Sequence, residues 1–149
     1  MPITTSPFVL DDVSLTLVPT GGGTPEEYQC QLNRAELVPS TAGGATGGAT
    51  FETFCNSYSS AGASASWSLE LTGFQAYQDA ADLSLLLFDN ESAEYDYVLT
   101  PAGGTVSASN PGFSGTVTLV ATNIGGTANQ YAQMQVSLPC NGKPTKVVA

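Results

Sequence analysis

The sequence contains no histidine, and only Arg34, Lys143 and Lys146 carry positive charge. Without imidazole there is no Ser–His–Asp or Cys–His catalytic arrangement and no histidine metal ligand. Three cations leave almost nothing with which to bind phosphate groups, so the composition argues against a nucleic-acid-binding surface. The longest apolar run, residues 85–88, is far too short to span a bilayer.

Cysteine is also scarce, because Cys30, Cys55 and Cys140 are the only three and lie far apart, without a CxxC pair. A secreted disulfide scaffold would have an even and denser set, so we expect reduced thiols in a reducing cytoplasm. No histidine base is available to activate one of them as a nucleophile. Residues 1–10 lack the basic and then apolar segments of a secretory signal, so export by that route is not expected.

The 149 residues that are present carry 13 Asp and Glu, which gives a formal net charge of −10. Charged residues make up 11% of the chain, against about 25% in an average soluble domain. Hydrophobic residues make up 42%, which distinguishes the chain from a disordered acidic tail. We therefore expect one folded domain over residues 1–149, with a core of its own.

Hydrophobic residues alternate with polar ones over most of the chain, which is the period of half-buried β-strands. We predict strands over residues 13–17, 28–37, 65–72, 95–100, 115–123 and 131–138. The predicted fold class is therefore mainly β, an antiparallel β-sandwich or barrel.

Two of these strands allow more detailed predictions. In residues 28–37, Tyr28, Cys30 and Leu32 share one face while Ala35 and Leu37 follow the other parity, which predicts a β-bulge near Arg34. In the last strand, the pattern predicts that Ala132, Met134, Val136 and Leu138 face the core while Gln133, Gln135 and Ser137 face outward.

Residues 79–90 break the alternation and predict one short helix. Asp79 is the expected N-cap, and Asp82 suits the positive start of the helix. Ala80, Leu83, Leu86 and Leu87 share one stripe, and we expect Asn90 to end the helix in the left-handed conformation. A strand over residues 83–88 is the competing interpretation.

The segment 40–64 is a long loop rich in Gly, Ala, Ser and Thr. Loops of this length are uncommon in compact domains unless they have a function. One interpretation is a flexible insertion. The other is a docking loop, because Phe51, Phe54 and Tyr58 are apolar enough to require burial, in particular against another subunit.

No group of residues in the sequence gives strong evidence for a metal, ligand or catalytic site. Asp89, Asn90, Glu91, Glu94 and Asp96 lack the spacing of a calcium loop, and the alternative is a solvated acidic turn. Trp67 alternates with Leu69 and Leu71, which favours a place in the core over ligand stacking. We expect no enzyme activity, no metal and no cofactor.

The C-terminal half carries a series of strand and turn motifs. It runs through Asp89-Asn90, the strand 95–101, Gly112-Phe113-Ser114-Gly115 with the strand that follows, Asn123-Ile124-Gly125-Gly126, and the segment 138–145 from Leu138-Pro139-Cys140-Asn141 onward. This order resembles the major tail proteins, or tail tube proteins, of long-tailed non-contractile bacteriophages, over about residues 65–146. The N-terminal half resembles that family only in layout, with two strands and a long loop before the third.

The resemblance implies a β-sandwich with one flanking helix, six copies of which form a ring. Rings then stack into a tube, assembled in the host cytoplasm and carried in the virion, through which the DNA leaves the capsid. The implied partners are further copies of the chain and the tape-measure, tail-terminator and distal tail proteins. DNA would pass without adhering, and no membrane is involved.

The resemblance also implies places for two sets of residues. The loop 40–64 corresponds to the inter-ring contact, with Phe51, Phe54 and Tyr58 as its anchors. A basic channel would hold the DNA that it must release, so we expect an acidic, polar lumen. The candidates for its wall are Gln29, Gln31, Ser66, Ser68, Glu70, Thr116, Thr118, Gln133 and Gln135. The charge of −10 has a simpler alternative role, which is to keep the monomer soluble.

Two other functions remain open on the sequence alone. A tail terminator or tail-completion protein would share the fold but form single capping rings. An immunoglobulin-like capsid-decoration or adhesion module would show the same strand pattern, because a fold does not fix a function.

Overall fold

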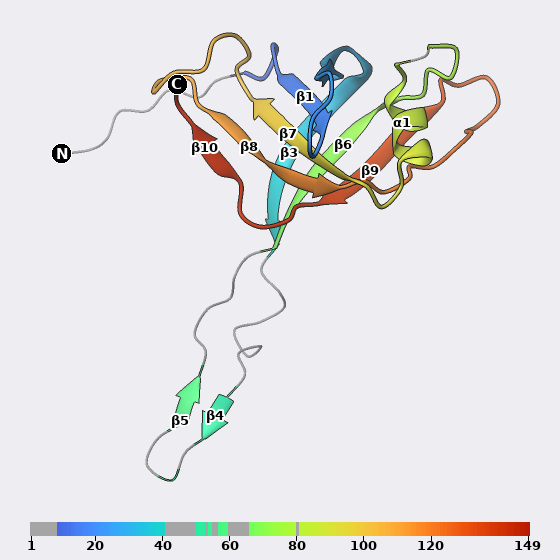
Figure 1. Ribbon diagram of the computed structural model, residues 1–149. Coiled ribbons are helices and arrows are strands. Elements are labelled where there is room, and N and C mark those ends of the chain that lie inside the picture. The colour runs from blue at the N-terminus through green and yellow to red at the C-terminus, as the bar shows by residue number, and fades with distance from the viewer. Residues whose placement is uncertain (1–8, 41–49, 53, 55–56, 60–65, 80) are drawn as a thin grey trace.

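The computed structural model describes residues 9–40, 50–52, 54, 57–59, 66–79 and 81–149. Two antiparallel sheets pack face to face, with one helix at their side (Figure 1). The five-stranded sheet has the order β10-β8-β7-β1-β2, formed by Thr145–Val147, Gly112–Thr118, Glu94–Thr100, Ser14–Pro19 and Glu26–Glu27. The three-stranded sheet has the order β3-β6-β9, formed by Leu32–Ser40, Ser66–Phe74 and Gln133–Pro139. The predicted class, an antiparallel β-sandwich with one short helix, is confirmed.

The core lies between the two sheets and follows the alternation of the strands. Leu15, Leu17 and Tyr97 of the five-stranded sheet are at most 1% exposed, as are Leu69 and Leu138 of the opposite sheet. Each such side chain contributes about 1.5–3 kcal/mol through removal of its apolar surface from water. In β9 the predicted division is confirmed, because Met134, Val136 and Leu138 are buried while the alternate residues are exposed, and Ala132 before the strand is half-buried.

The β-bulge predicted near Arg34 is present. Leu32 pairs with Gly73 and Arg34 pairs with the adjacent Thr72, so Asn33 is the extra residue. A side chain on Gly73 would clash with the backbone carbonyl of Gln31. The glycine therefore allows β6 and the segment before β3 to approach closely at the bulge.

The strand predicted from Tyr28 is shorter than expected. Gln29–Gln31 form a turn of 3-10 helix, η1, in which the Gln31 N–H donates to the Tyr28 carbonyl at 3.0 Å. Cys30 is consequently exposed and does not share a buried strand face with Tyr28. The strand predicted over 115–123 runs instead from Gly112 to Thr118, because the Leu119 N–H turns to the Ala93 carbonyl at 2.8 Å.

The helix α1 covers Leu83–Asp89 and starts three residues later than predicted. Its N-cap is Asp82 rather than Asp79, and Asp82 Oδ2 accepts from the Leu85 N–H at 3.1 Å. Asp79 belongs to the preceding turn, where its N–H donates to the Ala76 carbonyl. The predicted apolar stripe holds for Leu83 and Leu87, which are fully buried, whereas Ala80 lies outside the described residues.

The end of α1 also differs from the expectation. Asn90 is the C-cap, but its φ is −117°, so it is not left-handed. Its side-chain amide instead donates to the Leu86 carbonyl at 3.0 Å, and Ser92, with φ 71°, makes the left-handed turn.

The predicted loop 40–64 contains a short hairpin that the alternation did not indicate. β4, Thr50–Glu52, pairs with β5, Ser57–Ser59, and the register sets Phe51 opposite Tyr58. The other predicted anchor, Phe54, lies between the two strands and is fully exposed.

Asp82 is the buried residue that fixes the start of α1, and its loss should be costly. It also accepts from the Ala76 N–H at 3.0 Å and from the Gln31 side chain. We expect Asp82→Ala to lower the free energy of unfolding by about 2–4 kcal/mol, because it removes the cap and leaves partly buried donors unpaired. Urea denaturation measures this, and Asp79→Ala, at the exposed residue predicted as the cap, is the control with an expected change below about 0.5 kcal/mol.

Candidate functional site

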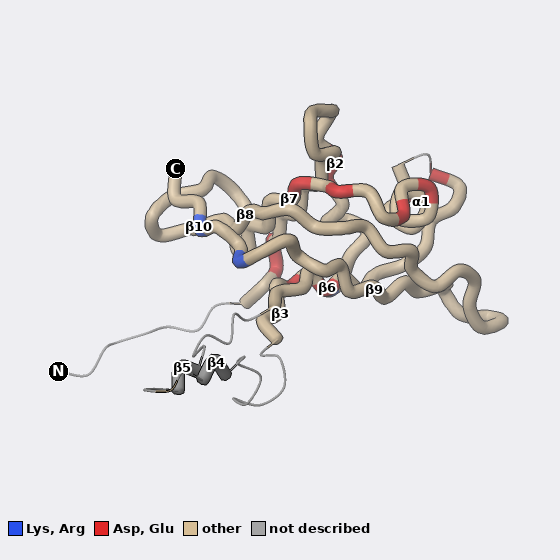
Figure 2. Tube along the Cα trace, turned by 60° about the horizontal axis from the view of Figure 1, so that its bottom comes forward, with Lys and Arg blue, Asp and Glu red and all other residues tan. Residues whose placement is uncertain are grey.

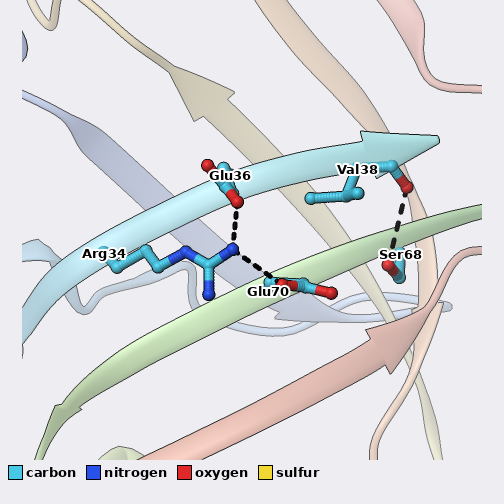
Figure 3. A network of polar contacts seen from close by, with 5 residues as sticks. All are labelled: Arg34, Glu36, Val38, Ser68 and Glu70. Atoms are coloured by element: carbon cyan, nitrogen blue, oxygen red, sulfur yellow. Dashed lines mark hydrogen bonds and ion pairs between the residues drawn. The ribbon is translucent and has the colours of Figure 1, made fainter.

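The outer face of the three-stranded sheet carries one charged cluster, centred on Arg34 (Figure 3). Glu36 of β3 and Glu70 of β6 are directly opposite in the register. Like charges in that position repel, but the Arg34 guanidinium lies between them. Its Nη2 is 2.8 Å from Glu70 Oε2 and also pairs with Glu36. The hydrogen bond to Glu36, together with the charges of both carboxylates, raises the pKa of Arg34.

The other polar side chains of β6 and β9 on that outer face are uncharged. Alternate residues of β6 and β9 supply hydroxyl and amide groups, and the Ser68 hydroxyl donates weakly to the Val38 carbonyl at 3.5 Å. These residues are Ser66, Ser68, Thr72, Gln133, Gln135 and Ser137. We call this surface, together with the Arg34 cluster, the three-strand face.

The outer face of the five-stranded sheet is more acidic. Asp96 Oδ1 accepts from the hydroxyls of Thr116, at 2.9 Å, and Thr20, at 3.1 Å. Glu94 Oε1 accepts from the Asn141 side chain at 3.0 Å, and Thr118 donates to Asn141 Oδ1 at 3.4 Å. Figure 2 shows acidic positions along β7, whereas the basic positions in this sheet lie at β10. We call this surface the five-strand face.

The nine predicted lumen residues do not lie on one surface. Ser66, Ser68, Glu70, Gln133 and Gln135 share the three-strand face, whereas Thr116 and Thr118 lie on the five-strand face.

The other two candidates, Gln29 and Gln31, belong to the turn η1. Gln31 joins the helix start, because its Oε1 accepts from the Leu83 N–H and its Nε2 donates to the Phe74 carbonyl at 2.7 Å. The expectation that all nine share one wall is therefore corrected, since a single sheet face includes at most five of them.

Five of the exposed apolar residues belong to segments at the two opposite ends of β6. At one end, Ser40 pairs with Ser66, and the chain between them carries the fully exposed Phe54. At the other end lies a set that we call the aromatic end, which comprises Phe74, Tyr77, Ile124 and Tyr131.

The aromatic end is held together by contacts between two loops. Phe74 is 47% and Tyr131 92% exposed, and both line one hollow of about 420 Å³. The Tyr77 hydroxyl accepts from the Gly125 N–H at 3.4 Å, which brings the loop of Ile124 to the loop after β6. The ends of a nine-residue strand are about 26 Å apart. Large exposed apolar groups of this kind mark interaction surfaces.

The predicted thiols differ in their surroundings. Cys30 is exposed, whereas Cys140 is half-buried and its Sγ donates to the Tyr97 hydroxyl at 3.8 Å. Burial raises the pKa of the Cys140 thiol, which disfavours the reactive thiolate. Burial also raises the pKa of Tyr97. Cys55 lies outside the described residues.

Among the described residues, no group of three or more Asp, Glu, Cys or His side chains is arranged to hold a metal ion. No helix in that part of the chain has the length and apolar character of a membrane span. Trp67 shares the inner face with Leu69 and Leu71 but is only half-buried, because it lies where the sandwich opens.

No protein-family model matches the sequence, and no curated protein matches it significantly. The function must therefore be inferred from the surfaces just described.

The alternation pattern does not identify Arg34 and Glu36 as residues of a candidate functional surface. Their contact with Glu70 depends on the register after the bulge, which pattern alone does not give. The sequence offers one signal for this cluster, which is the rarity of cations. A single Arg near two strands that each carry a Glu can neutralise both carboxylates.

The Arg34 cluster generates a prediction about salt. Arg34→Gln leaves Glu36 and Glu70 facing each other, so we expect a lower urea midpoint at low ionic strength. The loss should shrink near 1 M salt, where charges are screened beyond about 3 Å. Lys146→Gln is the control, because Lys146 makes no ion pair with a described residue. A loss that does not depend on salt would mean that Arg34 acts through packing of its stem rather than its charge.

Proposed function

We propose that this chain is a structural, non-enzymatic protein that forms six-membered rings, and that the rings stack into the tail tube of a long-tailed bacteriophage. The observation that carries the proposal is the presence of exposed aromatic residues in segments at opposite ends of β6. Phe54 lies in the insertion at one end, and Phe74 and Tyr131 lie at the other.

Two different surfaces at opposite ends favour a head-to-tail contact between copies. Such a heterologous contact does not close on itself when it runs along an axis, so it builds a stack. In this arrangement the hairpin of one ring contacts the aromatic end of the next. Burial of one phenylalanine at this contact contributes about 2 kcal/mol, and a ring makes the contact six times over.

The edges of the five-stranded sheet support closure of the ring. Its edge strand β10 carries Lys146, and its opposite edge strand β2 carries Glu26 and Glu27. Opposite charges on the two edges favour pairing between neighbouring copies over pairing of like edges. Sheets joined in this way form a closed barrel, which removes exposed edges.

A barrel built from these sheets has the five-strand face as its wall. The described residues of that face include Glu94, Asp96, Thr116 and Thr118 and no Lys or Arg. An acidic, hydroxyl-rich wall repels phosphate and provides no cation to release counterions from DNA. By contrast, the three-strand face carries Arg34.

Electron microscopy and analytical ultracentrifugation of the purified chain test the assembly. We expect rings and hollow tubes from the native sequence, and folded rings without long tubes from Phe54→Ser and from Tyr131→Ser. Phe88→Ser is the matched control, since Phe88 is a 56% exposed aromatic residue on α1 that belongs neither to the hairpin insertion nor to the aromatic end. Isolated rings from the native chain would favour the role of a tail terminator. Monomers at every concentration would contradict the proposal.

The wall of the lumen is tested by adding one cation to each face. In particles that carry the variant, Thr118→Lys should slow DNA ejection, most strongly at low salt where screening is weak. Ser68→Lys makes the same change from hydroxyl to cation on the three-strand face and should leave ejection unchanged. The reverse result would assign the wall to the three-strand face, and no effect from either variant would show that lumen charge is unimportant.

A further inference from the structure

The interior of the sandwich is closed on one side and open on the other. The helix α1 closes the first side with Leu83 and Leu87, both fully buried. Figure 1 shows β10 at the opposite side of the sandwich from α1. There a groove of about 590 Å³ lies between β3 and β10, and its lining is mostly apolar. Leu37, Trp67, Leu99 and Phe113 line it, with Lys143 and Lys146 beside them.

The start of the described chain runs beside this groove. Residues 10–13 lie against residues 32–36 of β3 and the bulge, around a hollow of about 340 Å³. Leu10 lines both hollows, whereas Asp11, Asp12 and Val13 line only the first. Leu37 lines only the second. From Val13 back to Leu10 the chain therefore runs along β3 toward Leu37, antiparallel to that strand.

The edge of β3 beside this path has no strand partner in the described part of the chain, because β3 pairs with β6 alone. Nine residues precede Leu10, and an extended segment of that length reaches about 30 Å. From Glu36 to the end of β3 at Ser40 the distance is about 13 Å. The segment is thus long enough to follow the whole remaining edge.

The composition of residues 1–9 suits an apolar site. The sequence Met-Pro-Ile-Thr-Thr-Ser-Pro-Phe-Val contains no charged side chain, so its burial desolvates none. In an extended chain Phe8 has the same parity as Leu10, which lines the groove. Pro2 and Pro7 are tolerated on an edge strand, where they also prevent a further strand from pairing.

We propose that residues 1–9 of the same chain bind along the edge of β3 as an additional strand and cover the apolar groove, with Phe8 over Trp67. The three-stranded sheet then gains a fourth strand, and the one open side of the sandwich is closed. This is a property of a single copy and does not depend on the tube.

Trp67 is the only tryptophan in the chain and lines the groove, so its fluorescence reports on the cover. In the 149-residue chain we expect Phe8→Ser to shift Trp67 emission to the red and to raise the acrylamide quenching constant roughly threefold, since the apolar indole becomes exposed. Phe88→Ser is the matched control, because it removes an exposed aromatic residue at the other side of the sandwich and should leave both values unchanged.

Two further measurements keep the proposal testable. Far-UV circular dichroism of Phe8→Ser should match that of the native chain, and the quenching constant of the native chain should not change on dilution. If Phe8→Ser quenches like the native chain, the segment does not cover the groove. If the quenching constant of Trp67 rises on dilution, the segment over the groove comes from a second copy. The proposed cover within one chain is then refuted, whereas the proposed assembly into a tube is not.

Discussion

The apolar interior between two sheets of unequal width must be closed along both sides, and the rest of the structure depends on how this is done. Five strands pack on three, so the inner face of the wider sheet extends beyond its partner. On one side a helix of only seven residues fills the gap. A helix that short is not stable by itself, so its position must be fixed by contacts outside it.

Asp82 and Gln31 supply those contacts. They connect the start of α1 to the turn η1 and to the end of β6, and through Gln31 the helix is tied to the strand that carries the bulge. The same end of β6 holds Phe74, which belongs to the aromatic end. A defect in this polar network would therefore loosen both the core and a surface that we assign to assembly.

Much of the fold could be predicted because the alternation of residues such as Met134, Val136 and Leu138 reports burial directly. The bulge at Arg34 was predicted for the same reason, since it shifts that alternation by one residue. The start of α1 could not be predicted, because Asp79 and Asp82 are both good N-caps and only tertiary contacts to Ala76 and Gln31 select the second. The lumen candidates were split between two faces because strand order and register, which pattern does not encode, decide which strands share a surface.

The outermost strand of the three-stranded sheet, β9, has an unusual neighbour in Asn123. Its amide Nδ2 donates to the Gln133 carbonyl at 2.8 Å while its Oδ1 accepts from the Gln135 N–H at 3.1 Å. One side chain thus presents the donor and acceptor of a peptide group, as an adjoining strand would. Deamidation of Asn123 to aspartate would replace that donor with a second acceptor facing a carbonyl. Chemical ageing at this single residue would therefore leave the Gln133 carbonyl at the edge of β9 without its side-chain donor and weaken the cover of that edge.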